Sequence, residues 1–169
     1  MTYDIKRMPT QIQNLFSNLS EPGSLGNLQP FRLMLVGSTG TGKTTTAYEL
    51  AKLIDADLLE VKLKHGRADL GWLSQIETHA RTRNLNWLDT GDHRERIKAV
   101  LLDEAELIPA NGICVRRSLD DHPNLFVIAT ANSIDKMHPS VVSRFKVIEC
   151  NGVDLRAELA HISINKLLE

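Results

Sequence analysis

The sequence is poor in cysteine and has no long hydrophobic run. Its two cysteines, Cys114 and Cys150, form no CxxC or Cys/His pattern, so we expect neither a zinc site nor a disulfide framework. A reducing, cytoplasmic location is therefore the expectation. No stretch approaches the ~18 apolar residues of a membrane span, and residues 1–10 carry charges with no apolar run behind them. The sequence thus argues against secretion and against membrane insertion.

A dominant charge of one sign is also missing. Twenty Lys and Arg residues against 21 Asp and Glu residues give a formal net charge of -1, so contact with nucleic acid would need a local basic patch. The histidines have no ligand-like spacing, which argues against a metal cluster, and we expect them at the surface. They are His65, His79, His93, His122, His138 and His161.

What the sequence contains is the material of one globular domain, since 42% of its 169 residues are hydrophobic and 24% are charged. Apolar runs predict strands, and apolar residues at helical spacing predict helices between them. The predicted strands cover residues 31–36, 58–63, 97–102, 125–131 and 145–148, and the predicted helices cover 12–19, 47–54, 70–80, 113–119 and 155–162. This alternation predicts an α/β three-layer sandwich, a five-stranded parallel sheet with helices on both faces.

A glycine-rich loop follows the first predicted strand. Residues 37–44 read GSTGTGKT, which matches the P-loop pattern G-x-x-x-x-G-K-[ST] between a buried strand and an amphipathic helix. Backbone N–H groups of such a loop face phosphates, while Lys43 reaches the β- and γ-phosphates and Thr44 offers a hydroxyl to Mg²⁺. The complete match disfavours the plain alternative of a turn without a ligand. The expected nucleotide-binding residues are Gly37, Ser38, Thr39, Gly40, Thr41, Gly42, Lys43, Thr44 and Thr45.

Two adjacent carboxylates end the third predicted strand. The stretch AVLLDE at residues 99–104 is similar to a Walker B motif. Neighbouring residues at a strand end point to different sides, so Asp103 can join the Mg²⁺ shell while Glu104 faces the γ-phosphate and polarises water. The alternative is a helix start, because acidic residues suit the first turn of a helix. Following a P-loop, the pair predicts hydrolysis of the nucleotide.

A polar amide ends the fourth predicted strand, where VIATAN occupies residues 127–132. Asn132 would lie between the two Walker strands and orient the attacking water. The alternative is a turn residue, because Asn-Ser-Ile-Asp suits a turn. We favour the functional interpretation because of the position of Asn132 in the predicted sheet.

Taken together, these motifs resemble those of the AAA+ ATPases, and most closely those of clamp-loader small subunits, followed by Holliday-junction motor ATPases. The resemblance covers residues 30–150. Its motifs, in order, are GSTGTGKTT at 37–45, VLLDE at 100–104, VRRSLDD at 115–121, ATAN at 129–132 and SRF at 143–145. It implies an oligomeric ATPase in which Asn132 is the sensor 1 residue.

The same resemblance implies that Arg144 is an arginine finger acting in trans on the nucleotide of a neighbouring subunit. The alternative is that Arg144 forms a solvated salt bridge. Arg116 and Arg117 are adjacent on a predicted helix, so at least one of them should face water.

The family usually continues into a helical lid that carries a sensor 2 arginine. Here a single helix is expected after residue 152, so the lid is predicted to be absent or minimal. Residues 1–152 form the expected nucleotide-binding domain and residues 153–169 the expected C-terminal helix.

A short basic segment follows the second predicted strand, where this family places substrate-contacting loops. Lys62, Lys64 and Arg67 could touch DNA phosphates there. Trp72 is expected to pack in the core, with a pore aromatic as the alternative.

The sequence therefore predicts an ATP- and Mg²⁺-dependent AAA+ ATPase of clamp-loader or DNA-motor type, with DNA and a sliding clamp or another replication protein as partners. Catalysis is assigned to Lys43, Glu104, Asn132 and Arg144, and metal binding to Thr44 and Asp103. Two alternatives stay open, a small-molecule P-loop kinase and a nucleotide-gated binding subunit with little turnover.

Overall fold

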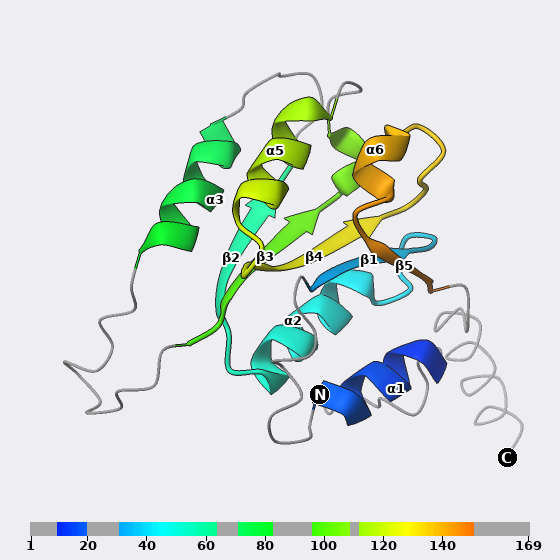
Figure 1. The fold of residues 1–169 in the computed structure, drawn as a ribbon. Coiled ribbons are helices and arrows are strands. Elements are labelled where there is room, and N and C mark those ends of the chain that lie inside the picture. Colours follow the sequence, from blue (N-terminus) through cyan, green and yellow to red (C-terminus); the bar gives the residue numbers. More distant parts are fainter. Residues whose placement is uncertain (1–9, 20–30, 64–70, 83–95, 109–111, 151–169) are drawn as a thin grey trace, which may run out of the picture.

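The computed structural model describes residues 10–19, 31–63, 71–82, 96–108 and 112–150. Its centre is one parallel sheet of five strands in the order β2-β3-β4-β1-β5 (Figure 1). In chain order the strands are β1 (Arg32–Val36), β2 (Asp57–Lys62), β3 (Lys98–Asp103), β4 (Phe126–Ala131) and β5 (Lys146–Glu149). The predicted five-stranded parallel sheet is thus confirmed, with every strand end within one residue of the expectation.

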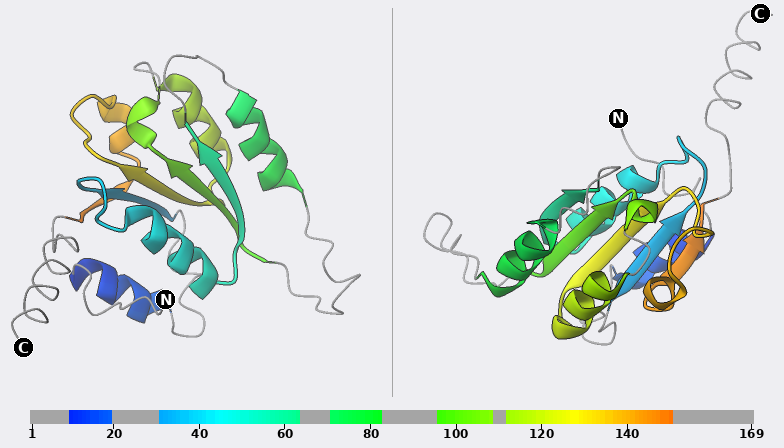
Figure 2. Two further views of the ribbon diagram at one scale, coloured as in Figure 1. Left: turned by 180° about the vertical axis from the view of Figure 1, so that it is seen from behind. Right: turned by 90° about the horizontal axis from the view of Figure 1, so that it is seen from above.

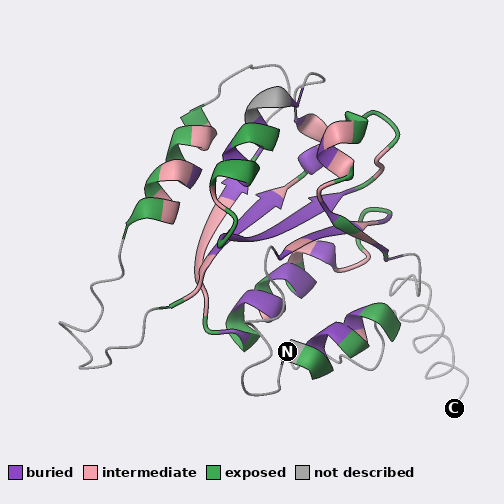
Figure 3. Ribbon diagram, viewed as in Figure 1, coloured by how far each residue is buried: buried purple, intermediate pink, exposed green. Residues whose placement is uncertain are grey.

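The central strand β4 is buried along its whole length. It pairs with β1 on one side and with β3 on the other, all in parallel register. A strand covered on both faces needs apolar residues throughout, which is why FVIATA reads as a nearly continuous apolar run. In Figure 3 the inner strands β3 and β4 are accordingly coloured as buried along almost their whole length, whereas the edge strand β2 is mostly intermediate.

Helices cover both faces of the sheet, as the two views of Figure 2 show. Helices α1 (Thr10–Leu19) and α2 (Lys43–Leu53) lie on one face, and α3 (Gly71–Arg81), α5 (Ile113–Asp121) and α6 (Pro139–Val142) lie on the other. A 3-10 turn, η3 (Ala105–Leu107), follows β3. None of the helices in these ranges is long and apolar enough to cross a bilayer.

Two apolar clusters hold the layers together, one on each face, because alternate residues of a strand point to opposite sides. On β1, for example, Met34 packs with the cluster below α3 and α5, whereas Leu33 and Leu35 pack with α1 and α2. Trp72 is partly buried against the first cluster, which agrees with its expected core position.

Two histidines expected at the surface are partly buried, so that expectation was wrong for them. His79 Nε2 lies 3.0 Å from the carbonyl oxygen of Asp57 and 3.1 Å from that of Ala99, between β2 and β3. His122 Nδ1 lies 3.0 Å from the carbonyl oxygen of Ser118. Both rings form hydrogen bonds with backbone carbonyl oxygens near strand or helix ends. The spacing of the histidines along the chain does not predict these contacts. The predicted helix at 155–162 and the domain boundary at 152 fall outside the described residues.

Candidate functional site

The carboxyl ends of β1, β3 and β4 meet at one edge of the sheet, because β4 lies between the other two. The loop of residues 37–42 follows β1, Asp103 ends β3, and Asn132 follows β4 (Figure 1). In parallel sheets this edge is where ligands bind. The predicted phosphate loop and the two predicted polar strand ends therefore form a single site.

The loop needs glycine at particular positions. Gly40 and Gly42 have φ angles of +87° and +79°, in the left-handed region that favours glycine. A Cβ atom on Gly37 would lie 3.1 Å from the carbonyl oxygen of Cys150, so a larger residue would need the neighbouring backbone to shift by a few tenths of an ångström. Gly42 stands at the N-cap of α2 and has no side chain to compete for the N–H groups of the first helical turn. These groups are the donors with which a helix N-terminus binds anions.

Lys43, the first residue of α2, directly follows this loop and is only 9% exposed. Its Nζ donates hydrogen bonds to the carbonyl oxygens of Gly37 at 2.7 Å and Ser38 at 2.9 Å, and to Oδ1 of Asn132 at 3.3 Å. Burial lowers the pKa of the lysine, and neighbouring acidic groups partly oppose this shift. A desolvated cation held by the loop backbone is suited to neutralising phosphate charge.

The hydroxyl of Thr44 and the carboxylate of Asp103 are brought together at the end of β3. Thr44 Oγ1 donates to Asp103 Oδ1 at 3.0 Å. Hard oxygen ligands of this kind suit Mg²⁺, which usually takes one or two protein groups and completes its shell with water and phosphate oxygens. The two residues predicted to hold the metal therefore fit that ion.

Glu104 follows with a backbone that L-residues rarely adopt, φ +60° and ψ +48°. Its side chain is exposed, directly after the half-buried Asp103 that ends β3. It also stands at the N-cap of η3, so the helix-start interpretation of the acidic pair is correct at the level of backbone structure. That role leaves the carboxylate available to the site.

Asn132 is fixed by a residue that the sequence analysis did not identify. Glu106 Oε1 accepts from Asn132 Nδ2 at 2.6 Å and from its backbone N–H at 3.2 Å. The amide oxygen of Asn132 consequently faces the loop, 3.3 Å from Lys43 Nζ and 3.4 Å from Thr39 Oγ1. The signal in the sequence was the position of Glu106, two residues after Glu104 in an acidic run. The spacing of these residues alone did not show that Glu106 contacts Asn132.

Thr130 was missed as well. It is 2% exposed and donates from Oγ1 to Asp103 Oδ1 at 2.6 Å. The signal in the sequence was a hydroxyl residue within an otherwise apolar strand, two positions before Asn132. Of the remaining expected nucleotide-binding residues, Thr41 Oγ1 donates to the carbonyl oxygen of Ser38 at 2.9 Å, and Thr45 is exposed in the first turn of α2.

Arg144 lies away from this site. Its guanidinium donates to both carboxylate oxygens of Asp120, with Nε at 3.0 Å and 3.2 Å and Nη2 at 2.8 Å, and its Nη1 donates to the carbonyl oxygen of Ser140 at 2.6 Å. Asp120 also pairs with Arg32, the first residue of β1. The loop follows the other end of β1, roughly 13 Å away at ~3.3 Å per residue. The structure thus separates Arg144 from the phosphate loop of its own chain.

The other basic residues singled out in the sequence are at the surface where the structure describes them. Lys62 is exposed and pairs with Glu60 at 3.1 Å. Lys64 and Arg67 lie outside the described residues. Arg116 and Arg117 are both exposed on α5, as expected for at least one of them.

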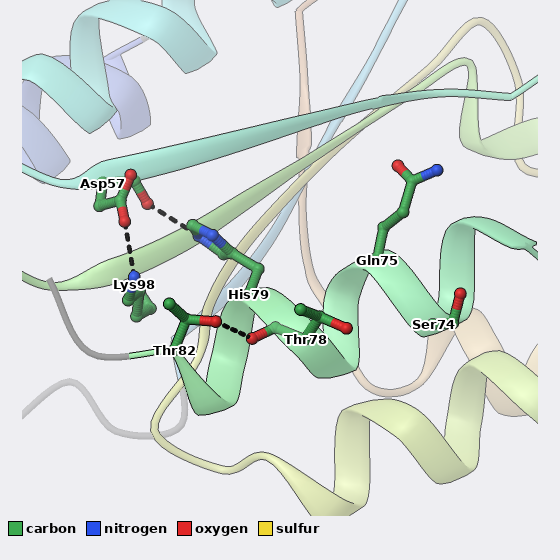
Figure 4. Close-up of a pocket in the computed structure, with 7 residues that line it drawn as sticks. All are labelled: Asp57, Ser74, Gln75, Thr78, His79, Thr82 and Lys98. Atoms are coloured by element: carbon green, nitrogen blue, oxygen red, sulfur yellow. Dashed lines mark hydrogen bonds and ion pairs between the residues drawn. The ribbon is translucent and has the colours of Figure 1, made fainter.

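A hollow lies at the opposite, amino-terminal end of the sheet, between α3 and the starts of β2 and β3 (Figure 4). Its volume is about 430 Å³. Lys98 Nζ is bonded to Asp57 Oδ2 at 2.6 Å, and the Thr82 hydroxyl donates to the carbonyl oxygen of Thr78 at 2.7 Å. The polar groups that line this hollow therefore bond largely to one another. They are not directed at a common position, in contrast to Lys43, Thr44, Asp103 and Asn132 at the phosphate loop.

Comparison with known proteins agrees with this geometry. A family model, "ATPase family associated with various cellular activities (AAA)", matches residues 33–153. Among solved structures, the chain is similar to that of C. elegans PCH-2, with a TM-score of 0.55, 16% sequence identity and coverage of 88% of this chain. The chain spans 44% of the length of that protein, and at this identity the likeness concerns the fold alone. No curated protein matches the sequence.

Proposed function

The chain belongs to the AAA ATPase family, and on that premise we propose that it hydrolyses ATP with Mg²⁺ at the edge formed by β1, β3 and β4. The observation that carries the proposal is the 3.0 Å contact between Thr44 of the loop and Asp103 of β3. This contact joins the phosphate-binding loop to the residue that would bind the metal. The proposed general base, Glu104, is the next residue in the chain after Asp103.

In this proposal each side chain has a separate task. When bound, Mg²⁺ supplies positive charge that stabilises the transferring phosphoryl group, and Thr44 and Asp103 would hold it. Lys43 neutralises phosphate charge with its ammonium, which the loop carbonyl oxygens of Gly37 and Ser38 hold. Glu104 takes the proton of the attacking water as general base, and Asn132 orients that water.

We propose further that the active form is an oligomer in which Arg144 completes the site of a neighbouring subunit. The support is its position near the amino end of β1, away from its own loop, together with the SRF motif. In a single chain the guanidinium is engaged by Asp120. This favours a second candidate, a subunit that binds nucleotide and turns it over slowly until it assembles.

The finer proposal is a clamp-loader or DNA-motor role. It rests on the similarity of residues 115–121 and 143–145 to those families and on the exposed Lys62. DNA should then stimulate phosphate release, and the stimulation should weaken with salt because phosphate contacts release counterions. A rate that DNA leaves unchanged at low salt would argue for a different polymer or partner.

Substitution of Glu104 by Gln tests the hydrolytic proposal. We expect Glu104→Gln to bind ATP normally while phosphate release, assayed without any added acceptor, falls by a factor of about 10²–10⁴, since the amide keeps the shape but cannot accept the proton. Glu49→Gln, on α2, serves as the control. Wild-type turnover in Glu104→Gln would contradict the assignment, and dependence of wild-type turnover on a small-molecule acceptor would indicate a kinase.

A further inference from the structure

Thr130 is a polar residue inside the most deeply buried strand of the sheet. We propose that it is a positioning residue for hydrolysis: its hydroxyl joins the side chain of Asp103 to the main chain of Glu104 and so fixes the direction of the general base. This inference rests on the proposed function. It assigns Thr130 no contact with the nucleotide.

The two hydrogen bonds of the hydroxyl have defined directions. Thr130 Oγ1 donates to Asp103 Oδ1 at 2.6 Å and accepts from the backbone N–H of Glu104 at 3.2 Å. A hydroxyl has a single hydrogen, and here it points to the carboxylate, so the oxygen lone pairs face the N–H group. One side chain thereby connects the predicted metal ligand with the residue that follows it.

The backbone of Glu104 shows why such a connection matters. Its φ of +60° lies in the left-handed region, which an L-residue occupies only when its surroundings hold it there. Two hydrogen bonds hold the backbone of Glu104. Its N–H donates to Thr130 Oγ1, and its carbonyl oxygen accepts from the N–H of Leu107 at 2.9 Å. Without the first, the peptide between Asp103 and Glu104 would keep, among the described residues, only the bond from the N–H of Leu63 to the carbonyl oxygen of Asp103, at 3.4 Å. The backbone that carries the Glu104 side chain would then be less restrained.

The position of Thr130 follows from the strand order. Register pairs Leu102 of β3 with Ala129 of β4, so the next residue of each strand, Asp103 and Thr130, lie side by side at the strand ends. Asp103 Oδ1 receives the hydroxyl of Thr44 as well. The Asp103 carboxylate is therefore oriented from α2 and from β4 together.

The test compares two substitutions at position 130. Thr130→Val keeps the shape of the side chain and removes the hydroxyl, whereas Thr130→Ser keeps the hydroxyl. We expect Thr130→Val to lower kcat at saturating Mg²⁺ at least about tenfold while KM and the Kd for ATP change less than about threefold. Thr130→Ser should recover most of the wild-type kcat.

The matched control is Ser118→Ala, which removes a buried hydroxyl from α5 and should retain wild-type kcat. Melting temperatures are measured for every variant. If Thr130→Val does not fold, Thr130→Cys replaces it, because the thiol has a similar size and is a weak donor. Loss of kcat in that variant with rescue by Thr130→Ser would support the proposal equally.

Three results would overturn the inference: wild-type kcat in the variant without the hydroxyl, a Thr130→Ser variant as slow as that variant, or a loss confined to ATP affinity. Wild-type hydrolysis is measured first, alone and with DNA. Its absence would refute the proposed function and the role of Thr130 with it. Measurable wild-type hydrolysis with no effect of Thr130→Val would refute the role of Thr130 alone.

Discussion

At the scale of single residues, the best-defined group is Lys43, whose ammonium is buried among carbonyl oxygens of the loop. We expect Lys43→Ala to lower ATP affinity by orders of magnitude, because the charge that neutralises the β- and γ-phosphates is lost. An equilibrium titration with ATP measures this. Lys52→Ala removes an exposed lysine from the last turn of the same helix and should bind as wild type does. Unchanged affinity in Lys43→Ala would remove the P-loop assignment.

Tyr48 offers a second prediction at this scale. A hydrogen bond to Glu60 is the main cause that raises the pKa of Tyr48 to about 12, and the same bond is the main cause that lowers the pKa of Glu60. Because the folded pKa of Tyr48 exceeds the ordinary value of 10.0, this bond stabilises the fold fully below that pH and its contribution is lost as pH rises towards the folded pKa.

The measurement is an ultraviolet titration of phenolate. The wild type should show a tyrosine that ionises near 12, and Tyr48→Phe should lack that component. In Glu60→Gln the Tyr48 component should move down towards its ordinary range. A Tyr48 component that stays in place in Glu60→Gln would show that another group causes the shift.

At the scale of elements, Asp120 at the end of α5 connects three parts of the chain. It accepts from Arg144, which precedes β5, and pairs with Arg32 at the start of β1. Hydrogen bonding to Arg144 is the main cause that lowers the pKa of Asp120 from 3.8. Since the folded pKa is depressed, the stabilisation is present above that ordinary value and is lost as pH falls through the lower folded pKa.

We therefore expect Asp120→Asn to lower the melting temperature at neutral pH and to matter little at strongly acid pH, where wild-type Asp120 is itself protonated. Thermal unfolding across this pH range measures the difference. Asp121→Asn is the matched control, because Asp121 pairs with Arg117 across one exposed helical turn at 3.8 Å and should matter less. Equal effects at neutral and acid pH would show that Asp120 acts through packing and not through charge.

At the scale of the whole molecule, the separation of Arg144 from its own loop predicts a composite site. Arg144→Ala and Glu104→Gln should each bind ATP and hydrolyse it poorly, because each homomer lacks one half of every site. Arginine fingers contribute about 10³–10⁵ in rate where they have been assigned. Mixed together, the two variants should exceed the sum of their separate rates, since some interfaces pair an intact Glu104 with an intact Arg144.

Phosphate release of the mixture measures this, and mass measurement of the mixed oligomer provides the control for co-assembly. An inactive mixture despite co-assembly, or loss of ATP binding in Arg144→Ala alone, would assign Arg144 a structural role in its own chain.

Features that depend only on neighbouring residues in the chain were predictable from the sequence. Apolar runs predicted the strands, and apolar residues at helical spacing predicted most helices of the sandwich. The P-loop was evident because its glycines, lysine and threonine lie within one contiguous stretch of the chain. Asp103 and Glu104 were found for the same reason, since a carboxylate pair at a strand end is a local pattern.

Tertiary structure alone decided which distant side chains meet. Apolar periodicity is the same for any order of parallel strands. The position of Asn132 between the two Walker strands was predicted from its motif, and the observed order, with β4 between β3 and β1, agrees with that prediction. That order brings Thr130 to Asp103 and Glu106 to Asn132, and the packing of α5 brings Asp120 to Arg144. Each of these contacts is a hydrogen bond between polar groups of separate elements. Their partners are set by register and layer packing, which the chain acquires only when the sheet and its helices assemble.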